Sequence, residues 1–449
     1  MEEMNRWIDE YLELLKNGKY GQLKAELNDL NPADLAEFFE AVPAEKQLLV
    51  FRLLSKDAAA ETFSYMDPDM QENLVRSITD SELHNILEEM YLDDTVDFLS
   101  EMPANLVSKI LKNTDEDTRK LINQYLNYPE NSAGSLMTNE YVQFLEDMNI
   151  GQAMAQLRKT GLDKETIYTC YVINRSRVLV GVLSLREILL ADDAQMVRDV
   201  MEDDVISVTT HEDQEEVADL FKKYDLVALP VTDGENRLVG IITVDDIVDV
   251  IEQENTEDFE KMAALIPAED EYLKTGVFTL AKNRVVWLLI LMISGTISSF
   301  IISANQALVA QVVVLSSFFP MLMDTGGNAG SQASTLTIRG IALGEIKPSN
   351  ILTVLWKEFR VGVLCGAVLG AVNFVRQTAL HSADFKVNVT VSITMGLAVV
   401  VAKCLGCLLP LGAKMLKLDP ALMASPLLTT VVDAIVLMMF FGLTRLIVL

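Results

Sequence analysis

The chain has 449 residues, enough for about three domains, and half of them are hydrophobic, with a formal net charge of −29. The charge is unevenly divided, because residues 1–274 hold 24 Lys/Arg and 59 Asp/Glu whereas residues 275–449 hold 12 and 6. A first part this acidic repels nucleic acid, so cations or basic surfaces are its expected partners. The four cysteines suggest no disulfide framework.

The two parts are predicted to lie in different solvents. Residues 276–449 contain several apolar runs of roughly the 20 residues that cross a bilayer, which predicts an α-helical membrane domain in contact with lipid. The chain begins MEEMNRWIDE, with neither a basic nor an apolar leader region, so no cleavable signal peptide is expected. The acidic part is therefore expected to remain in the cytosol.

Residues 1–130 are predicted to form an all-α domain. Short amphipathic segments such as NPADLAEFFEAVP and TDSELHNILEEMY each begin with a capping residue, among them Asn31, Ser55 and Thr79. Repeated helices of this kind stack into a superhelix. Its acids Glu61, Asp93, Asp94 and Asp97 either face a neighbouring domain or simply form a solvated surface.

Residues 131–252 contain an α/β repeat. VGVLSLREIL at 180–189 matches VGIITVDDIV at 239–248, and Leu136-Met137-Thr138 is echoed by Val200-Met201-Glu202. Each copy is predicted to run strand, helix, strand, strand, helix, with CYVIN and ALPVTD as buried strands. The segment resembles a tandem pair of CBS domains, which implies a regulatory module that binds adenine nucleotides or ions. No nucleophile with a base, P-loop or dinucleotide fingerprint is present, so no enzymatic activity is expected.

A linker helix is predicted to follow, over residues 253–275. Glu254, Glu257 and Asp258 fall at i, i+3 and i+4, which places three carboxylates on one helical face. Their repulsion is relieved either by a divalent cation or by plain solvation.

Five membrane spans are predicted, over residues 285–302, 309–338, 361–375, 387–409 and 427–449. With the amino terminus inside, eight Lys/Arg flank the inner ends and three flank the outer ends. This orientation keeps the acidic domains in the cytosol and places the carboxyl terminus outside.

Two of these spans carry polar groups. Asp324, Asn328 and Gln332 follow one another at four-residue spacing in the second, where Pro and Gly weaken the helix, so this span is expected to line a water-filled pathway. Close packing of small residues is the alternative. Thr429 and Asp433 in the fifth span offer the hard oxygen ligands that suit Mg²⁺ or Ca²⁺, and the chain has only three histidines for softer metals. A purely structural ion pair between Asp433 and Lys403 is the alternative for this acid.

The motifs PMLMDTGGNAGSQ and DPALMASPLLTTVVDA, together with the order helical repeat, CBS pair, linker helix and five spans, resemble the MgtE family of magnesium channels or transporters. The resemblance implies a homodimer with a pore on its two-fold axis, in which Asp433 holds hydrated Mg²⁺ and Asn328 and Thr429 complete the site. It also implies a plug helix whose acids meet Asp419 across bound Mg²⁺ and close the cytosolic mouth. Further regulatory Mg²⁺ positions that match the family are Asp213, Glu215, Asp225, Asp246 and Asp249 in the CBS pair, Glu61, Asp93 and Asp97 in the helical domain, and, through backbone oxygen, Lys222 and Ser135.

The expected function is therefore Mg²⁺ uptake across a bacterial inner membrane, inhibited by Mg²⁺ bound to the cytosolic acids. Two alternatives remain open from the sequence. One is a broader transporter of Mn²⁺, Co²⁺ or Ca²⁺, because these ions share oxygen ligands with Mg²⁺. The other is regulation chiefly by ATP at the CBS pair.

Overall fold

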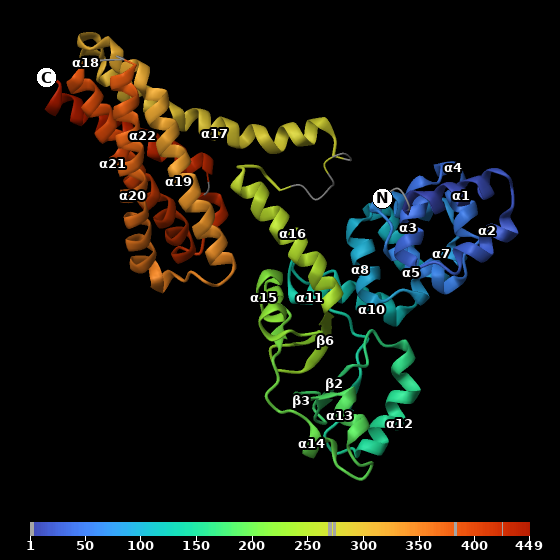
Figure 1. Cartoon of the computed structure of the whole chain (residues 1–449). Coiled ribbons are helices and arrows are strands. Elements are labelled where there is room, and N and C mark those ends of the chain that lie inside the picture. Colours follow the sequence, from blue (N-terminus) through green and yellow to red (C-terminus); the bar gives the residue numbers. More distant parts are fainter. Residues whose placement is uncertain (1–3, 268–271, 273–274, 381–383, 424) are drawn as a thin grey trace. The chain divides into compact units, whose positions relative to one another are not determined.

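The computed structural model describes residues 4–267, 272, 275–380, 384–423 and 425–449 (Figure 1). The chain divides into two compact units, Met1–Ile251 and Glu252–Leu449, which are called unit 1 and unit 2 here. Unit 1 holds the short helices and the two small sheets, and unit 2 holds the long apolar helices.

Unit 1 begins with a succession of short helices, as the sequence predicts. They are α1 (Met4–Lys16), α2 (Tyr20–Leu27), α3 (Pro32–Ala41), α4 (Ala44–Phe51), α5 (Lys56–Ser64), α6 (Pro68–Ser77), α7 (Asp80–Glu89), α8 (Leu92–Glu101), α9 (Ala104–Asn113) and α10 (Glu116–Tyr125).

The predicted caps and an aromatic core explain these helices. Asn31, Ser55 and Thr79 each accept a hydrogen bond from a backbone N–H in the first turn of the helix that follows, and Thr79 does so within a capping box. A chain of aromatic rings then joins α3, α4, α5 and α8, with centroids 5.1 to 6.4 Å apart, through Phe38, Phe39, Phe51, Phe63 and Phe98. Such ring contacts add to the free energy of burial.

Two α/β units follow, and both have the predicted order of elements. The first contains α11 (Ala133–Leu136), β1 (Gln143–Leu145), α12 (Ile150–Thr160), η1 (Gly161–Asp163), β2 (Thr169–Ile173), β3 (Leu179–Ser184), α13 (Leu185–Leu190) and α14 (Val197–Val200). The second contains β4 (Val208–Thr209), α15 (Gln214–Tyr224), β5 (Ala228–Thr232), β6 (Leu238–Thr243) and the start of α16 (Val244–Met262). The sheet orders are β1-β2-β3 and β4-β5-β6, each with one parallel and one antiparallel pair.

The repeated tripeptides link the two α/β units. Thr138 forms an isolated bridge to Ile241 in β6, and Glu202 forms the equivalent bridge to Val182 in β3. Beside each bridge a methionine covers a strand glycine, so that a Cβ at Gly240 would lie 2.7 Å from Met137 Sδ. Each of the two tripeptide segments, 136–138 and 200–202, therefore pairs with the edge strand of a sheet. This shared position accounts for their similar sequences.

The linker helix is shorter than the sequence predicts. Helix α16 ends at Met262, and residues 263–267 are not helical, with Ala264 in the left-handed region at φ 55°. The remainder of the predicted linker at 268–271, 273 and 274 lies outside the described residues.

Unit 2 has five long helices within its described residues, joined by shorter ones. They are α17 (Val277–Ala304), α18 (Gln306–Gln311), η2 (Val313–Phe318), α19 (Phe319–Ala342), η3 (Pro348–Asn350), α20 (Ile351–Ala379), α21 (Phe385–Met415), η4 (Pro420–Met423) and α22 (Ser425–Ile447). The predicted continuous span over 309–338 is wrong in its first third, because α18 and η2 precede α19. Among the residues that the structure describes, four helical stretches are long and apolar enough to cross a membrane by length and composition, and α19 is not one of them. Its polar residues lower its hydropathy.

Helix α19 packs closely against α21 and α22. A Cβ at Gly326 would lie 3.0 Å from Val432 Cγ1, and one at Gly330 would lie 3.3 Å from the Ala402 carbonyl oxygen. Small residues of this kind allow membrane helices to approach closely. The small face of α19 is thus buried, which leaves its opposite face uncovered by this chain.

Candidate ion pathway and regulatory acids

One uncovered face of α19 is rich in polar residues, although Leu336 is also exposed beside them. Pro320, Asp324, Asn328, Gln332, Thr335 and Arg339 are all exposed in the single chain and recur at three- or four-residue spacing. A polar face on a membrane helix is stable only when it meets water or another protein surface. The predicted pathway residues Asp324, Asn328 and Gln332 therefore share one face, which points away from the core of unit 2.

The fifth long helix brings the principal acid beside this face. Asp433 is half-buried on α22, and its carboxylate lies close enough to Asp324 for their charges to repel. One turn earlier, Thr429 contacts α19, since a Cβ at Gly327 would lie 3.0 Å from Thr429 Cγ2. The Thr429 hydroxyl donates to the Pro426 carbonyl at 2.9 Å, so its lone pairs remain available to a cation or its water. Asp433, Asp324 and Thr429 thus gather around one stretch of the α19–α22 contact.

The alternative role for Asp433 is not supported. Lys403 is buried on α21, but within the described part of the chain it forms no ion pair with Asp433 or any other acid. The group whose charge acts on Asp433 is the like-charged Asp324. A pair of acids at membrane depth favours binding of a cation over a structural ion pair.

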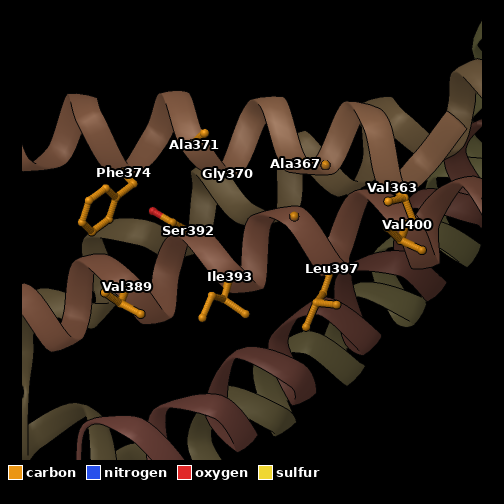
Figure 2. Close-up of a pocket in the computed structure, with 12 residues that line it drawn as sticks. Val363, Ala367, Gly370, Ala371, Phe374, Val389, Ser392, Ile393, Leu397 and Val400 are labelled. Atoms are coloured by element: carbon orange, nitrogen blue, oxygen red, sulfur yellow. The ribbon is translucent and has the colours of Figure 1, made fainter. Parts of the chain in front are cut away.

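A groove elsewhere in unit 2 does not suit an ion. It has a volume of about 580 Å³, lies between α20 and α21, and is lined by side chains such as Val363, Phe374, Ile393 and Leu397 (Figure 2). Ser392 is the one hydroxyl-bearing residue of its lining. A hydrated cation needs oxygen ligands, so the polar face of α19 is the better candidate pathway.

The turn before α22 fixes the position of Asp419. Helix α21 ends at Met415, and Lys417 adopts the left-handed conformation at φ 58°, while the Leu418 N–H donates to the Ala413 carbonyl at 2.9 Å. This pattern is a Schellman cap. Asp419 then caps η4, with its Oδ1 accepting from the Ala421 N–H at 2.8 Å. The second carboxylate oxygen of Asp419, Oδ2, faces α16.

A lysine occupies the place where the sequence predicts bound Mg²⁺. Lys261 Nζ lies 2.6 Å from Glu257 Oε1 and 2.8 Å from Asp419 Oδ2. Burial opposes the charge of Lys261, but the hydrogen bonds to Asp419 and Glu257 outweigh it, so the pKa of this ammonium is raised. The pKa of Asp258 is also raised, by burial and by repulsion from Asp419. Glu254, Glu257, Asp258 and Lys261 form the half-buried face of this part of α16.

In unit 1, α8 brings acids against the start of α16. Asp93 is buried, and its pKa is raised well above the usual range by burial and then by repulsion from Asp246, Asp94 and Glu165. Asp97 keeps an exposed surface, but the protein around it and the charge of Asp246 raise its pKa to about 7. Burial and the neighbouring Asp245 raise the pKa of Asp94 and of Asp246 to about 6 and that of Glu165 to about 7. Here these acids are called the α8 acid cluster.

Two other predicted acids lie at its margin. Glu61 and Asp249 are both exposed, and both are close enough to Tyr65 to act on its phenol by charge. Their charges thus meet on the side of α5 and α16, next to Asp94 and Asp245.

The remaining predicted positions surround α15. Asp213 caps its first turn by accepting from the Glu215 N–H at 2.9 Å, and Asp225 ends it in the left-handed conformation at φ 51°. Lys222 is exposed near its end, with Nζ 3.7 Å from Asp219. Ser135 exchanges hydrogen bonds with Ser132, which bridges to Asp213. Asp213 and Asp225 have local capping roles, and none of these positions is brought into the α8 acid cluster.

Metal coordination by bare side chains is not preformed. Within the described residues, no three or more His, Cys, Asp and Glu side chains converge as a metal site. The donors near α8, α16 and α22 are carboxylates and hydroxyls, which suit a hard cation. Because Mg²⁺ keeps several of its waters and uses one or two carboxylates, it fits such widely spaced acids.

The sequence does not predict three residues of these clusters. Asp245 and Glu165 join the α8 acid cluster through folding, although Asp245 is adjacent to the predicted Asp246. Lys261 had a detectable signal, because it follows Glu257 by four residues, the spacing of a helical ion pair.

Comparisons with known proteins agree along the whole chain. Residues 319–443 match a family described as MgtE, divalent cation transporter. Residues 30–131 match the MgtE intracellular N domain, and residues 133–193 and 197–253 each match the CBS domain. The chain is 36% identical over 438 residues to the magnesium transporter MgtE of Thermus thermophilus, covering 97% of each chain. It is 32% identical over 430 residues to that of Bacillus subtilis, covering 96% of this chain and 95% of the relative.

A solved structure is similar to the first half of the chain. It is the cytosolic domain of the Mg²⁺ channel MgtE in complex with ATP, with a TM-score of 0.52 and 38% identity. The match covers 54% of this chain and 99% of the solved one.

The α8 acid cluster predicts a pH-dependent stability. Its acids have folded-state pKa values above the ordinary values of an unfolded chain, so their stabilising contribution is complete below pH 4 and is lost as pH rises through 6 to 7. In EDTA, the thermal midpoint of unit 1 in the full chain should fall between pH 5 and pH 8, by roughly 2–4 °C per kcal/mol lost.

Mg²⁺ should offset that fall at pH 8. Asp97→Asn should flatten the dependence, whereas Asp34→Asn on the exposed face of α3 should leave it intact. Differential scanning fluorimetry of both variants measures this. A midpoint that is independent of pH in the unsubstituted chain would contradict the electrostatic account of the cluster.

Proposed function

Because the chain belongs to the MgtE family of magnesium transporters, which are not enzymes, we propose that it forms a Mg²⁺-selective uptake pathway that Mg²⁺ itself closes from the cytosol. The observation that carries this proposal is the exposed polar face of α19, beside which the helix that holds Thr429 and Asp433 packs. We place the pathway in residues 276–449, the plug in 253–275 and the sensors in 1–130 and 131–252.

The pathway is built between two copies of the chain. The exposed polar stripe of Asp324, Asn328 and Gln332 is supported in a membrane only if it faces water or a second subunit. A two-fold arrangement brings two copies of Asp433 to one axis. Two carboxylates that hold Mg²⁺ through its waters select the ion and still release it, since Mg²⁺ binds oxygen at about 2.1 Å and dehydrates slowly.

Gating follows from repulsion between acids. At low cytosolic Mg²⁺ the α8 acid cluster and the acids of α16 repel one another, so the sensor domains separate and shift the plug toward leaving the pore. At high Mg²⁺ the ions bridge Asp93, Asp97 and Asp246, and Glu61 and Asp249 at the margin, and the plug docks at Asp419. Each bound ion shifts the equilibrium only by its preference for the closed state, so several sites are needed for a steep response. The acids around α15, including Asp213, Glu215 and Asp225, provide further sites.

The orientation places both sensors in the cytosol of a bacterium. The surplus of basic residues at the inner ends of the helices supports an inner-membrane protein with its carboxyl terminus outside. Lipid then covers the exposed apolar side chains of α17 and α20, such as Leu288, Phe300, Leu364 and Val368.

Substitution of Asp433 tests the pathway. Asp433→Ala and Asp433→Asn should each reduce Mg²⁺ uptake into proteoliposomes at least tenfold, a loss of about 1.4 kcal/mol or more in ion stabilisation. Glu345→Gln, at an exposed acid outside the long helices, should leave uptake unchanged. A fluorescent Mg²⁺ indicator inside the vesicles measures the rate, and normal uptake by Asp433→Ala would exclude this acid from the pathway. Competition with Mn²⁺, Co²⁺ and Ca²⁺ in the same assay measures selectivity.

Nucleotide control is a second candidate, because a similar cytosolic domain binds ATP. ATP would occupy the CBS pair and act as a co-regulator. Calorimetric titration of the full chain with ATP, with and without Mg²⁺, should be paired with limited proteolysis of unit 1. We expect Mg²⁺ alone to protect unit 1 from cleavage. Tight ATP binding without any Mg²⁺-dependent protection would make nucleotide the principal signal.

A further inference from the structure

We propose that Lys261 is a built-in cation that holds a fraction of α16 docked at the Asp419 turn in the absence of Mg²⁺, against the repulsion that separates the sensor domains. Mg²⁺ must displace this lysine to bind there and dock the remainder. This inference rests on the proposed function only in identifying α16 as the plug. In this proposal, Lys261 sets the Mg²⁺ concentration at which the plug becomes fully docked.

The geometry is that of a bridging ion. The Lys261 ammonium joins a carboxylate on its own helix, at 2.6 Å, to a carboxylate on the turn before α22, at 2.8 Å. All three side chains are partly shielded, with 23% of Lys261, 33% of Glu257 and 28% of Asp419 exposed. Shielded ion pairs are screened less by salt than pairs that are fully exposed.

The Asp419 carboxylate is also held in place. One of its oxygens accepts from the Ala421 backbone N–H, so the other is directed at Lys261 without further ordering of the side chain. Preorganisation of this kind lowers the entropy cost of an ion pair. A hydrogen bond also joins the segment after α16 to α17, because the Ile266 N–H donates to the Asn283 carbonyl at 3.2 Å.

Charge balance explains why a divalent ion still binds. Glu254, Glu257, Asp258 and Asp419 contribute four carboxylates, and Asp258 also feels the charge of Lys414. Two ammonium groups leave this cluster acidic. Mg²⁺ and the Lys261 ammonium cannot share the same two oxygens, because they carry like charges and Mg²⁺ requires contacts of about 2.1 Å or its own water shell. The flexible lysine stem allows the ammonium to swing into solvent when Mg²⁺ arrives.

Docking of α16 is measurable without transport. Spin labels are attached at Phe259→Cys on α16 and at Leu416→Cys after α21, both of which are exposed positions. The native cysteines at 170, 365, 404 and 407 of the full chain are replaced by Ala. Electron–electron double resonance in nanodiscs then gives the docked fraction in EDTA and in Mg²⁺. In EDTA, Lys261→Met should lower the ratio of docked to undocked states roughly fivefold, the size expected for a partly shielded ion pair.

Three further variants complete the test. Lys261→Arg should keep α16 docked in EDTA, and the exchange Lys261→Asp with Asp419→Lys should restore docking but abolish its response to Mg²⁺. Lys120→Met removes a lysine that pairs with Glu116 at the same spacing on an exposed helix face, and should change nothing. In Lys261→Met, Mg²⁺ should bring α16 to full docking at a lower concentration than the unsubstituted chain needs for full docking.

Unchanged docking of Lys261→Met in EDTA would overturn the proposal. If Lys261→Met loses docking but Mg²⁺ has no effect on any variant, the lysine bridge stands and Mg²⁺ gating through α16 fails. The two hypotheses are therefore separated by the EDTA and Mg²⁺ arms of one measurement.

Discussion

Repulsion between carboxylates that the fold holds close together is the interaction on which the rest of this protein depends. Burial raises the free energy of a charged carboxylate, and a second carboxylate nearby raises it further. The chain creates this situation between α8 and the start of α16, at the Asp419 turn, and between Asp433 and Asp324. In each place the charge is compensated by protonation, by a lysine or by a cation from solution. The proposed sensing of Mg²⁺ and its proposed conduction therefore rest on the same carboxylate chemistry.

The membrane domain solves a different physical problem. Glycines on one face of α19 allow it to approach α21 and α22 closely, and that contact leaves the polar stripe on the opposite face. A helix with a buried small face and an exposed polar face is stable in a bilayer only beside water or a second subunit. Gly327 of α19 also meets Thr429, and Gly326 meets Val432, the residue before Asp433. The close packing of α19 thus also determines where the candidate ion pathway lies.

Much of this architecture can be predicted from the sequence, because residues close together in the chain determine the helices and strands. The caps at Asn31, Ser55 and Thr79 predict the short helices, and the repeated strands predict two similar sheets. The polar stripe on α19 follows from four-residue spacing alone. The resemblance to a known family adds the expected roles of Asp433 and Asp419, which spacing does not give.

What escapes prediction depends on contacts between distant segments. Glu165 meets Asp246 only after the α/β units have folded, so no local pattern reveals the pair. The Pro and Gly residues of the second span indicate a weak helix but not the place where α18 and η2 interrupt it. The acids of α16 suggest a cation site, yet whether the cation is Mg²⁺ or a lysine depends on where the Asp419 turn places its carboxylate.

Single-channel recording from inside-out patches tests the central claim most directly, since the cytosolic face is then open to solution changes. With Mg²⁺ as the carried ion, stepping cytosolic Mg²⁺ upward without nucleotide should lower the open probability steeply, and washing it out should restore the original value. Because several sites act together, the response should be steeper than binding of one ion. An open probability that is indifferent to cytosolic Mg²⁺, or that changes only when ATP is added, would contradict the account.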